Sequence, residues 1–183
     1  MQGVLGQISG IFKNAPLWRE PEFVPEKFSI RPVDAWDGDP AAGALLFQGI
    51  FTKNGAQLSL EDAGWDPQNV DETWPIHPHG FTWLRDLREY ACSGVSARGQ
   101  SAAMAWMMIL AWIEHYGDIK TTKRFFYRPD IAAQRLSMWI SLYEFFAPER
   151  FESARITNGS DEDFHEQFFA CSYLHANHLS RAL

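Results

Sequence analysis

Two histidine pairs in this sequence have residue types and spacings that could do chemistry. In the first pair, His77 and His79 flank a proline just before an expected helix. An H-x-H pair can bind a metal ion when further ligands lie at suitable spacing. No third ligand follows nearby, so a His-based metal enzyme is the less favoured hypothesis. We therefore predict no metal site and no cofactor.

In the second pair, His175 and His178 are one helical turn apart and lie close to Tyr173 and Asn177. These residue types can remove a proton next to a carboxylate. On a helix, however, the side chains of Tyr173 and His175 would point about 200° apart. We therefore expect a packed or solvated helix at this position, and we predict no catalytic residue in the chain.

Arginines and loop tryptophans could bind an acidic sugar. Arg128 and Arg135 lie around the start of an expected helix, where two guanidinium groups can form a fork for a carboxylate. The alternative is an ion pair between Arg128 and Asp130 that fixes the loop. Trp65 and Trp74 fall in an expected loop, where indole rings can form stacking platforms for sugars. The predicted substrate-binding residues are Trp65, Trp74, Arg128 and Arg135.

The size and charge of the chain limit its classes of partner. Its 183 residues are enough for one domain or for a piece of a larger domain. Fourteen Phe, eight Trp and five Tyr residues indicate a ring-rich core or rings along a groove. The net charge of −7 argues against nucleic acid as the main partner, because phosphate binding needs a basic surface. It argues equally against an anionic membrane surface.

The two cysteines and the apolar runs of the sequence bear on the cellular location of the protein. Cys92 and Cys171 are expected to be buried thiols in a reducing compartment, with a single long-range disulfide as the alternative. Residues 1–18 lack the basic and apolar regions of an export signal, so we expect a cytoplasmic protein. The longest apolar run, Ala102–Ile113, has twelve residues, and a membrane span needs about twenty. This run therefore predicts a buried helix.

The chain is expected to have two parts, an N-terminal lead-in over residues 1–27 and a single helical domain over residues 28–183. The domain begins with an extended arm over 28–36, in which a proline disfavours helix. A turn over Asp37-Gly38-Asp39-Pro40 is expected to lead from the arm into the first short helix.

Two local signals then define short elements. Asp39 as an N-cap, followed by Pro40 at the first helical position, predicts a short helix over 41–47. Asn54-Gly55 lies between two runs of β-type residues and predicts a two-residue hairpin over about 50–60. The following stretch up to residue 79 is expected to be a loop.

Apolar residues at helical spacing predict longer helices over about 80–183. Their expected spans are Gly80 to about Ala91, Gln100–Tyr116, Asp130 to Pro148, and Ser160 to the end, with Asp130 and the Ser160/Asp163 pair as helix-start signals. The last helix has no glycine or proline to end it. We therefore expect either a chain cut from a longer protein or a helix end that a partner covers.

Three motifs resemble the N-terminal part of one known family. They are Asp34-Ala-Trp-Asp-Gly-Asp39, His79-Gly-Phe-Thr-Trp-Leu-Arg-Asp-Leu87, and Arg128-Pro-Asp-Ile-Ala-Ala-Gln-Arg-Leu136 with Trp139. They are similar to the patterns Asp-x-Trp-x-Gly-Asp, His-Gly-Phe-x-Trp-Leu-Arg-Asp-Leu and Arg-Pro-Asp-x-x-x-x-Arg-Leu-x-x-Trp of bacterial heparinase II/III-like proteins. The order and the spacing agree over about residues 28–183, and the second and third motifs are fairly specific in combination.

The resemblance implies both a fold and an activity. The family fold is an α/α toroid, in which antiparallel helix pairs surround a groove, followed by a β-sandwich. For this chain it implies a mainly α fold: a partial α/α toroid with a small N-terminal β-hairpin. Family enzymes are polysaccharide lyases that cleave uronic-acid-containing glycans by β-elimination. They neutralise the uronate carboxylate, remove the C5 proton with a Tyr or a His, and expel the 4-linked sugar.

The catalytic Asn, Tyr and His residues of the family come from later helices and from the β-sandwich, beyond Leu183, so none is carried over. The matched motifs are expected to be architectural. The expected partner is a uronic-acid-containing polysaccharide or oligosaccharide. A partial toroid would leave an apolar flank exposed, which predicts self-association or a missing C-terminal partner. The alternative function is a stand-alone helical module that binds an acidic glycan or a partner protein.

Overall fold

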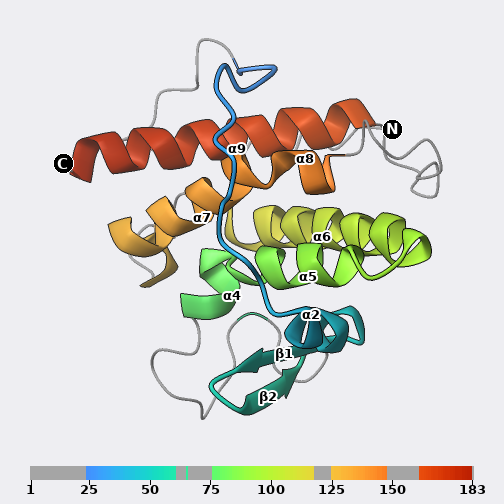
Figure 1. The fold of residues 1–183 in the computed structure, drawn as a ribbon. Helices are drawn as coiled ribbons and strands as arrows, with labels where there is room; N and C mark the ends of the chain where they lie inside the picture. Colours follow the sequence, from blue (N-terminus) through green and yellow to red (C-terminus); the bar gives the residue numbers. More distant parts are fainter. Residues whose placement is uncertain (1–23, 61–64, 66–75, 118–124, 148–160, 183) are drawn as a thin grey trace, which may run out of the picture.

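The computed structural model describes residues 24–60, 65, 76–117, 125–147 and 161–182. These residues are mainly helical and include a two-stranded antiparallel sheet, which confirms the coarse fold class (Figure 1). The toroid stays a prediction. The elements in chain order are α2 (Pro40–Phe47), β1 (Ile50–Lys53), β2 (Ala56–Ser59), α4 (Ile76–Gly80), α5 (Trp83–Ala91), α6 (Val95–Tyr116), the 3-10 helix η2 (Phe125–Tyr127), α7 (Pro129–Ser141), α8 (Tyr143–Phe146) and α9 (Asp161–Ala182).

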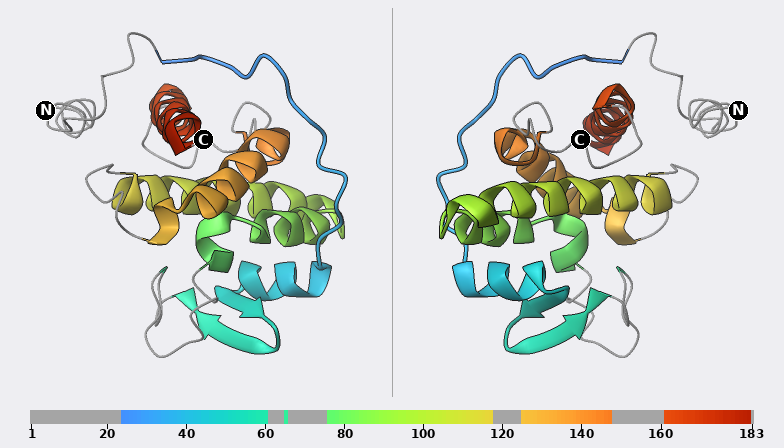
Figure 2. Two further views of the ribbon diagram at one scale, coloured as in Figure 1. Left: turned by 90° about the vertical axis from the view of Figure 1, so that its left-hand side faces the viewer. Right: turned by 90° about the vertical axis from the view of Figure 1, so that its right-hand side faces the viewer.

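The helices are stacked in tiers (Figures 1 and 2). In the view of Figure 1, α9 crosses the top, α7 and α8 lie below it, α5 and α6 come next, and α2 lies beside the hairpin at the bottom. α2 packs on α5, α5 on α6, and α7 on α9. An extended arm, residues 24–39, runs from the level of α9 down to α2 (Figure 1). None of the described helices is long and apolar enough to cross a membrane.

Aromatic side chains fill the core between these tiers of helices. The described aromatic side chains pack mainly on one another rather than along an open groove. The largest buried rings include Phe81, Trp83, Trp112, Phe126, Trp139, Tyr143, Phe146 and Phe168. Such rings each remove a large apolar area from water and also gain from edge-to-face contacts, so they dominate the packing energy.

The short helix and the hairpin agree with their sequence signals. The Asp39 carboxylate accepts a hydrogen bond from the Ala41 N–H at 2.8 Å, and Pro40 is the first residue of α2. Asn54 and Gly55 have φ values of 51° and 82°, as a type I′ turn requires. Both predictions are confirmed because each signal acts within a few residues of itself.

Phe81 lies between α4 and α5. The helix predicted from Gly80 therefore begins at Trp83, and α4 forms at Ile76–Gly80, where a loop was predicted up to residue 79. The φ of Phe81 is +60°, in the left-handed region, which costs a bulky residue about 1–3 kcal/mol. The ring is fully buried and lies 5.2 Å from the rings of Trp83 and Trp139. Burial of this ring offsets the backbone strain and separates the end of α4 from the start of α5.

The start of α7 also differs from its prediction. Arg128 is the N-cap and Pro129 the first helical residue, whereas Asp130 was expected to cap the helix. The Asp130 carboxylate instead accepts from the Arg128 guanidinium at 2.8 Å, so no side-chain cap forms. Proline suits the first helical position because that residue needs no N–H there. The helix ends at Ser141, and α8 follows after one residue.

Other expected helix ends agree only in part. α6 begins at Val95, five residues before the predicted Gln100, and ends at Tyr116 with Gly117 as its C-cap, as expected. α9 is present from Asp161 to Ala182. The predicted signals at Pro148 and Ser160 lie outside the described residues, as does the side chain of Asp163.

Both cysteines are free thiols. Cys171 is buried on α9, as predicted. Cys92 is exposed, so the prediction of two buried thiols is wrong for this residue. The reason is local, because Cys92 is the C-cap of α5 and lies in the short turn that leads into α6.

Two glycines let the first motif and α2 lie directly on the backbone of α5. A Cβ atom on Gly38 would lie 2.3 Å from the carbonyl carbon of Arg85. A Cβ atom on Gly43 would lie 2.1 Å from the carbonyl oxygen of Asp86. Both distances are far below van der Waals contact, and both neighbours are backbone atoms that cannot turn aside. Glycine is therefore required at these two positions by close approach.

We predict that Gly43→Ala forces α2 away from α5 and lowers the free energy of unfolding by about 1–3 kcal/mol, the usual cost of overpacking. Urea unfolding measures this change. Gly99→Ala is the matched control, because a Cβ atom there meets nothing within 4 Å. In a helix that substitution should stabilise by up to about 1 kcal/mol. Equal stability of the two variants would contradict the close contact.

Candidate functional site

A buried arginine lies where four elements meet. Arg135 on α7 is fully buried. Its Nη1 donates to the His79 carbonyl of α4 at 2.9 Å, and its Nη2 donates to the Phe126 carbonyl of η2 at 3.1 Å. Its Nε and Nη2 atoms also lie 3.1 and 2.7 Å from Nε2 of His175 on α9. We call this set of residues the Arg135 centre.

The hydrogen bonds fix the tautomer of His175. Its Nδ1 lies 2.7 Å from the Cys171 carbonyl oxygen, which can only accept, so Nδ1 carries the proton and Nε2 accepts from Arg135. Burial, and next the charge of Arg135, lower the pKa of His175 well below 6.5. The imidazole is therefore neutral at pH 7. It serves as a hydrogen-bond acceptor for a cation, not as a second cation.

Arg135 and Cys171 keep their protons at neutral pH. Burial lowers the pKa of Arg135 to about 10, so its guanidinium is a cation at neutral pH. Burial raises the pKa of the Cys171 thiol to about 12, although the Arg135 charge acts in the opposite direction. Because a thiolate is the reactive form of cysteine, Cys171 is not an activated nucleophile here.

Aromatic rings take the place of a counter-ion. Among the described residues, no carboxylate forms an ion pair with Arg135. Its Cζ atom lies 4.1 Å from the centre of the Trp112 ring and 5.8 Å from that of Tyr127. A guanidinium over a ring face gains about 2 kcal/mol when desolvated. These contacts, with the carbonyl and imidazole acceptors, offset part of the cost of burying a cation.

His79 is also held on both ring nitrogens. Trp112 Nε1 donates to its Nδ1 at 2.8 Å, so Nε2 carries the proton and donates to the Trp65 carbonyl at 3.0 Å. The ring stacks on Phe126 with the planes 13° apart. Both nitrogens of His79 thus face protein partners, whereas His77 contacts Thr82 instead. Within the described ranges, no group of three or more His, Cys, Asp or Glu residues could hold a metal ion.

A second polar cluster fastens the arm to α5. Arg85 donates from Nη2 to Asp34 at 2.8 Å and from Nε at 3.0 Å, and Arg88 donates from Nη1 at 3.1 Å. Arg88 Nη2 also donates to the Trp36 carbonyl at 2.6 Å. Burial alone would raise the pKa of Asp34, but the hydrogen bond and the charge of Arg85, with the charge of Arg88, lower it overall. We call Asp34, Arg85 and Arg88 the arm clamp.

The segments that carry the three sequence motifs contact one another. The arm clamp joins the first motif to the second, and the Asp39 N–H adds a hydrogen bond of 2.8 Å to the Asp86 carboxylate. The second motif meets the third where Arg135 binds the His79 carbonyl and where Trp139 packs on Phe81. In the sequence these residues are related only by their resemblance to a family pattern. In the structure their segments are joined by ion pairs, hydrogen bonds and ring packing.

Arg128 and Arg135 lie in different environments. Arg128 is exposed and pairs with Asp130 at 2.8 Å, which is the loop-fixing ion pair that the sequence left open. Arg135 is buried and its hydrogen bonds go to protein acceptors. The structure therefore does not bring the two guanidinium groups together as an exposed fork. Binding of a substrate by either residue stays a prediction.

The predicted tryptophan platforms are only partly described. Trp65 is half-buried, and its ring stacks on Phe81 with the ring centres 5.8 Å apart. Trp74 lies outside the described residues. Trp36 is not among the predicted platforms, although it is 70% exposed. The sequence predicted that Trp36 lies in the extended arm, but its neighbouring residues do not predict whether its ring is exposed or buried.

Comparison with protein-family models, with curated proteins and with solved structures gives no match. The fold and the contacts described above are therefore the observations that bear on function.

We predict a loss of stability in mild acid that depends on His77. Burial, with the charge of Lys53, lowers the pKa of His77 from 6.5 to about 4 in the folded protein. The unfolded chain therefore takes up this proton first, and stability falls as the pH drops from about 6.5 towards 4. The expected loss from this group is about 3 kcal/mol.

Urea unfolding at a series of pH values measures this loss. His77→Gln should flatten the decline between pH 6.5 and 4, because glutamine has no proton to gain. His115→Gln is the matched control, since the His115 side chain is exposed on α6. A decline that is as steep in the His77 variant as in the control variant would show that the His77 ring is not the cause.

Proposed function

We propose that this chain is the N-terminal helical segment of a heparinase II/III-like polysaccharide lyase, and that it acts in the cytoplasm on uronic-acid-containing glycans. The observation that carries the proposal is the contact between the segments that hold the three motifs. Asp34 of the first motif binds Arg85 of the second, and Arg135 of the third binds the His79 carbonyl of the second. Motifs that are far apart in the sequence are thus parts of one mainly helical framework.

The chemistry of the reaction supports separate architectural and catalytic parts within such an enzyme. β-Elimination needs a group that neutralises the uronate carboxylate and a base that removes the C5 proton. In the Arg135 centre, His79 and His175 use both ring nitrogens for contacts within the protein. The Cys171 thiol keeps its proton. These residues therefore suit an architectural role, and we propose that the catalytic residues of the complete enzyme lie outside this chain.

Trp65 and Arg128 are the best candidates for contact with the glycan. A chain of contacts joins them, because His79 binds the Trp65 carbonyl and stacks on Phe126, which is two residues before Arg128. The ion pair of Arg128 with Asp130 is exposed, and such pairs contribute only about 0–1 kcal/mol. A uronate carboxylate could therefore replace Asp130 at small cost.

Arg135 has a positioning role in this proposal. It lies beneath the proposed contact surface, where it binds the carbonyls of His79 and Phe126. It therefore fixes both the histidine that contacts Trp65 and the 3-10 turn that leads to Arg128. The guanidinium itself does not reach the glycan, because its side chain is fully buried.

Binding of uronate oligosaccharides to the purified chain tests this proposal. At about 100 times its dissociation constant, a ligand should stabilise the protein by roughly 2.7 kcal/mol, which raises the melting temperature. We expect such a rise with at least one uronate oligosaccharide and its loss in Arg128→Ala. Arg98→Ala removes another exposed arginine, on α6, and should keep the full rise.

Three outcomes would contradict the proposal. If no uronate oligosaccharide raised the melting temperature, or if the Arg98 variant lost the rise as fully as the Arg128 variant, this surface would not be a specific glycan site. If the purified chain alone released unsaturated uronate from a polysaccharide, the catalytic residues would lie within it. The ultraviolet absorbance of the unsaturated product detects that release directly.

A further inference from the structure

The extended arm has an inner row of side chains spaced three residues apart. The Phe28 ring lies 4.9 Å from that of Phe169, Arg31 binds Glu144 at 2.6 Å, and Asp34 is held in the arm clamp. A repeat of three residues is typical of a polyproline II conformation. The inner row therefore fastens the arm to α9, α8 and α5 in turn.

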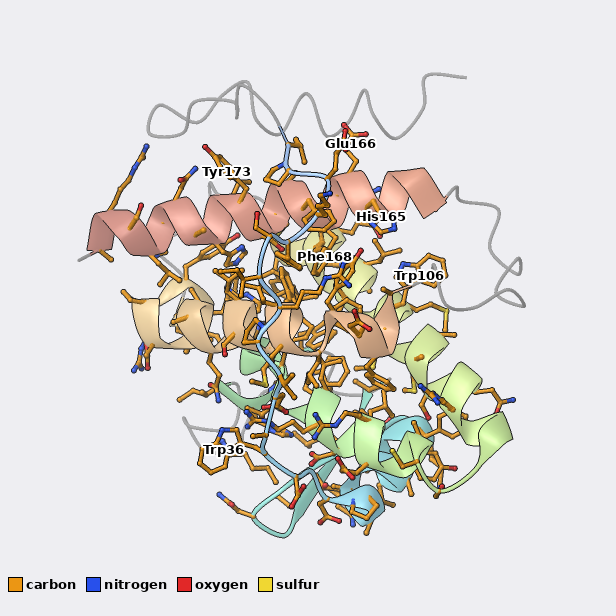
Figure 3. All side chains as sticks on the ribbon, turned by 45° about the horizontal axis from the view of Figure 1, so that its top comes forward. Trp36, Trp106, His165, Glu166, Phe168 and Tyr173 are labelled. Carbon is orange, nitrogen blue, oxygen red and sulfur yellow. The ribbon has the colours of Figure 1, made fainter. Side chains whose placement is uncertain are left out.

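A second row with the same spacing faces away from the protein. Ile30, Val33 and Trp36 are 80%, 89% and 70% exposed, and we call them the outer row. Figure 3 shows Trp36 projecting from the lower part of the arm. Large apolar side chains that are exposed together on a fixed segment are a feature of interaction sites. Because the inner row already holds the arm, a partner would lose little free energy in ordering it.

The surroundings of Trp36 are acidic. Asp37 and Asp39 follow it on the arm, and both are exposed. Arg88, which binds the Trp36 carbonyl, and Arg85 are already paired with Asp34 in the arm clamp. A cation is therefore attracted to this end of the arm, and it can also bind over the indole face. An anionic glycan is repelled here, and so is a second copy of a chain whose net charge is −7.

We propose that the outer row is a docking site for a basic protein segment that carries both aliphatic and Lys or Arg side chains. A cationic side chain lies over Trp36 beside Asp37, and aliphatic side chains cover Ile30 and Val33. The six steps from Ile30 to Trp36 span roughly 19 Å at 3.1 Å per residue. An extended segment of about six residues, at about 3.3 Å each, matches this length. This site is independent of the proposed glycan surface.

Binding of a labelled synthetic peptide to the full chain tests the proposal. The probe is a ten-residue peptide of alternating Leu and Arg, and its twin has Glu in place of Arg; fluorescence anisotropy gives both affinities. We expect the Leu/Arg peptide to bind at least about tenfold more tightly than the twin. Trp36→Ala should weaken its binding about tenfold, and Asp37→Asn by a smaller factor of about two to three. Unchanged melting temperatures show that these exposed variants fold.

Matched substitutions on α6 separate this site from general attraction to an acidic protein. Met107→Ala removes another exposed apolar side chain, and Glu114→Gln removes an exposed charge near the end of α6 that lies away from the arm (Figure 2). Both variants should bind the peptide as the wild type does. The proposal is overturned if Trp36→Ala binds equally well, if Glu114→Gln weakens binding as much as Asp37→Asn, or if the Leu/Glu twin binds as tightly.

Sedimentation of the chain without peptide tests the competing occupant of the outer row. A wild-type dimer that dissociates in Trp36→Ala would show that a second copy covers the outer row, which overturns the proposal of a basic partner. A sedimentation coefficient that is the same for the wild type and for Trp36→Ala supports the proposal, because it leaves the outer row accessible to the peptide.

Discussion

The burial of one guanidinium group is the interaction on which most of this structure depends. Arg135 donates to backbone carbonyls of α4 and η2 and to an imidazole of α9, while it belongs to α7 itself. A buried donor or acceptor that loses its partner costs about 1–3 kcal/mol, and more when a charge is involved. The four elements therefore adopt the positions that keep every one of these bonds. The neutral state of His175 follows from the same requirement.

A second constraint acts on the other side of the molecule, where the arm and α2 meet α5. The arm clamp supplies the charge pairing, and Gly38 and Gly43 permit the backbones to touch. The residues that resemble a family pattern are thus mainly the ones that connect elements distant in sequence. The proposed binding residues lie outside these contacts: the half-buried Trp65 and the exposed Arg128 for the glycan, and the outer row for a partner segment.

Local sequence signals predicted the elements that depend on a few neighbouring residues. The start of α2 at Asp39 and Pro40 and the Asn54-Gly55 turn agree with the structure because each signal fixes its own backbone. The long helices α6 and α9 follow from the pattern of apolar residues, although the first residue of α6 does not. The break at Phe81 escaped prediction because its strain is offset by rings that come from α6 and α7.

The candidate site was predicted less well than the fold, for a related reason. Arginine is rarely buried, so Arg135 in a sequence is most simply interpreted as an exposed binding group. Its burial depends on acceptors that lie 56 and 40 residues away along the chain. The spacing of residues in the sequence does not predict that these acceptors lie next to Arg135. The same holds for Trp36, whose exposure follows from the inner row of the arm and not from its own neighbours.

A double-mutant cycle between Arg135 and His175 tests the central claim most directly. The free energies of unfolding of the wild type, Arg135→Met, His175→Leu and the double variant are measured in urea at pH 7. Because the two side chains share a buried hydrogen bond, we expect the double variant to be at least about 1 kcal/mol more stable than the sum of the single losses implies. Losses that add to within about 0.3 kcal/mol would show that Arg135 does not join α7 to α9, and would contradict the account.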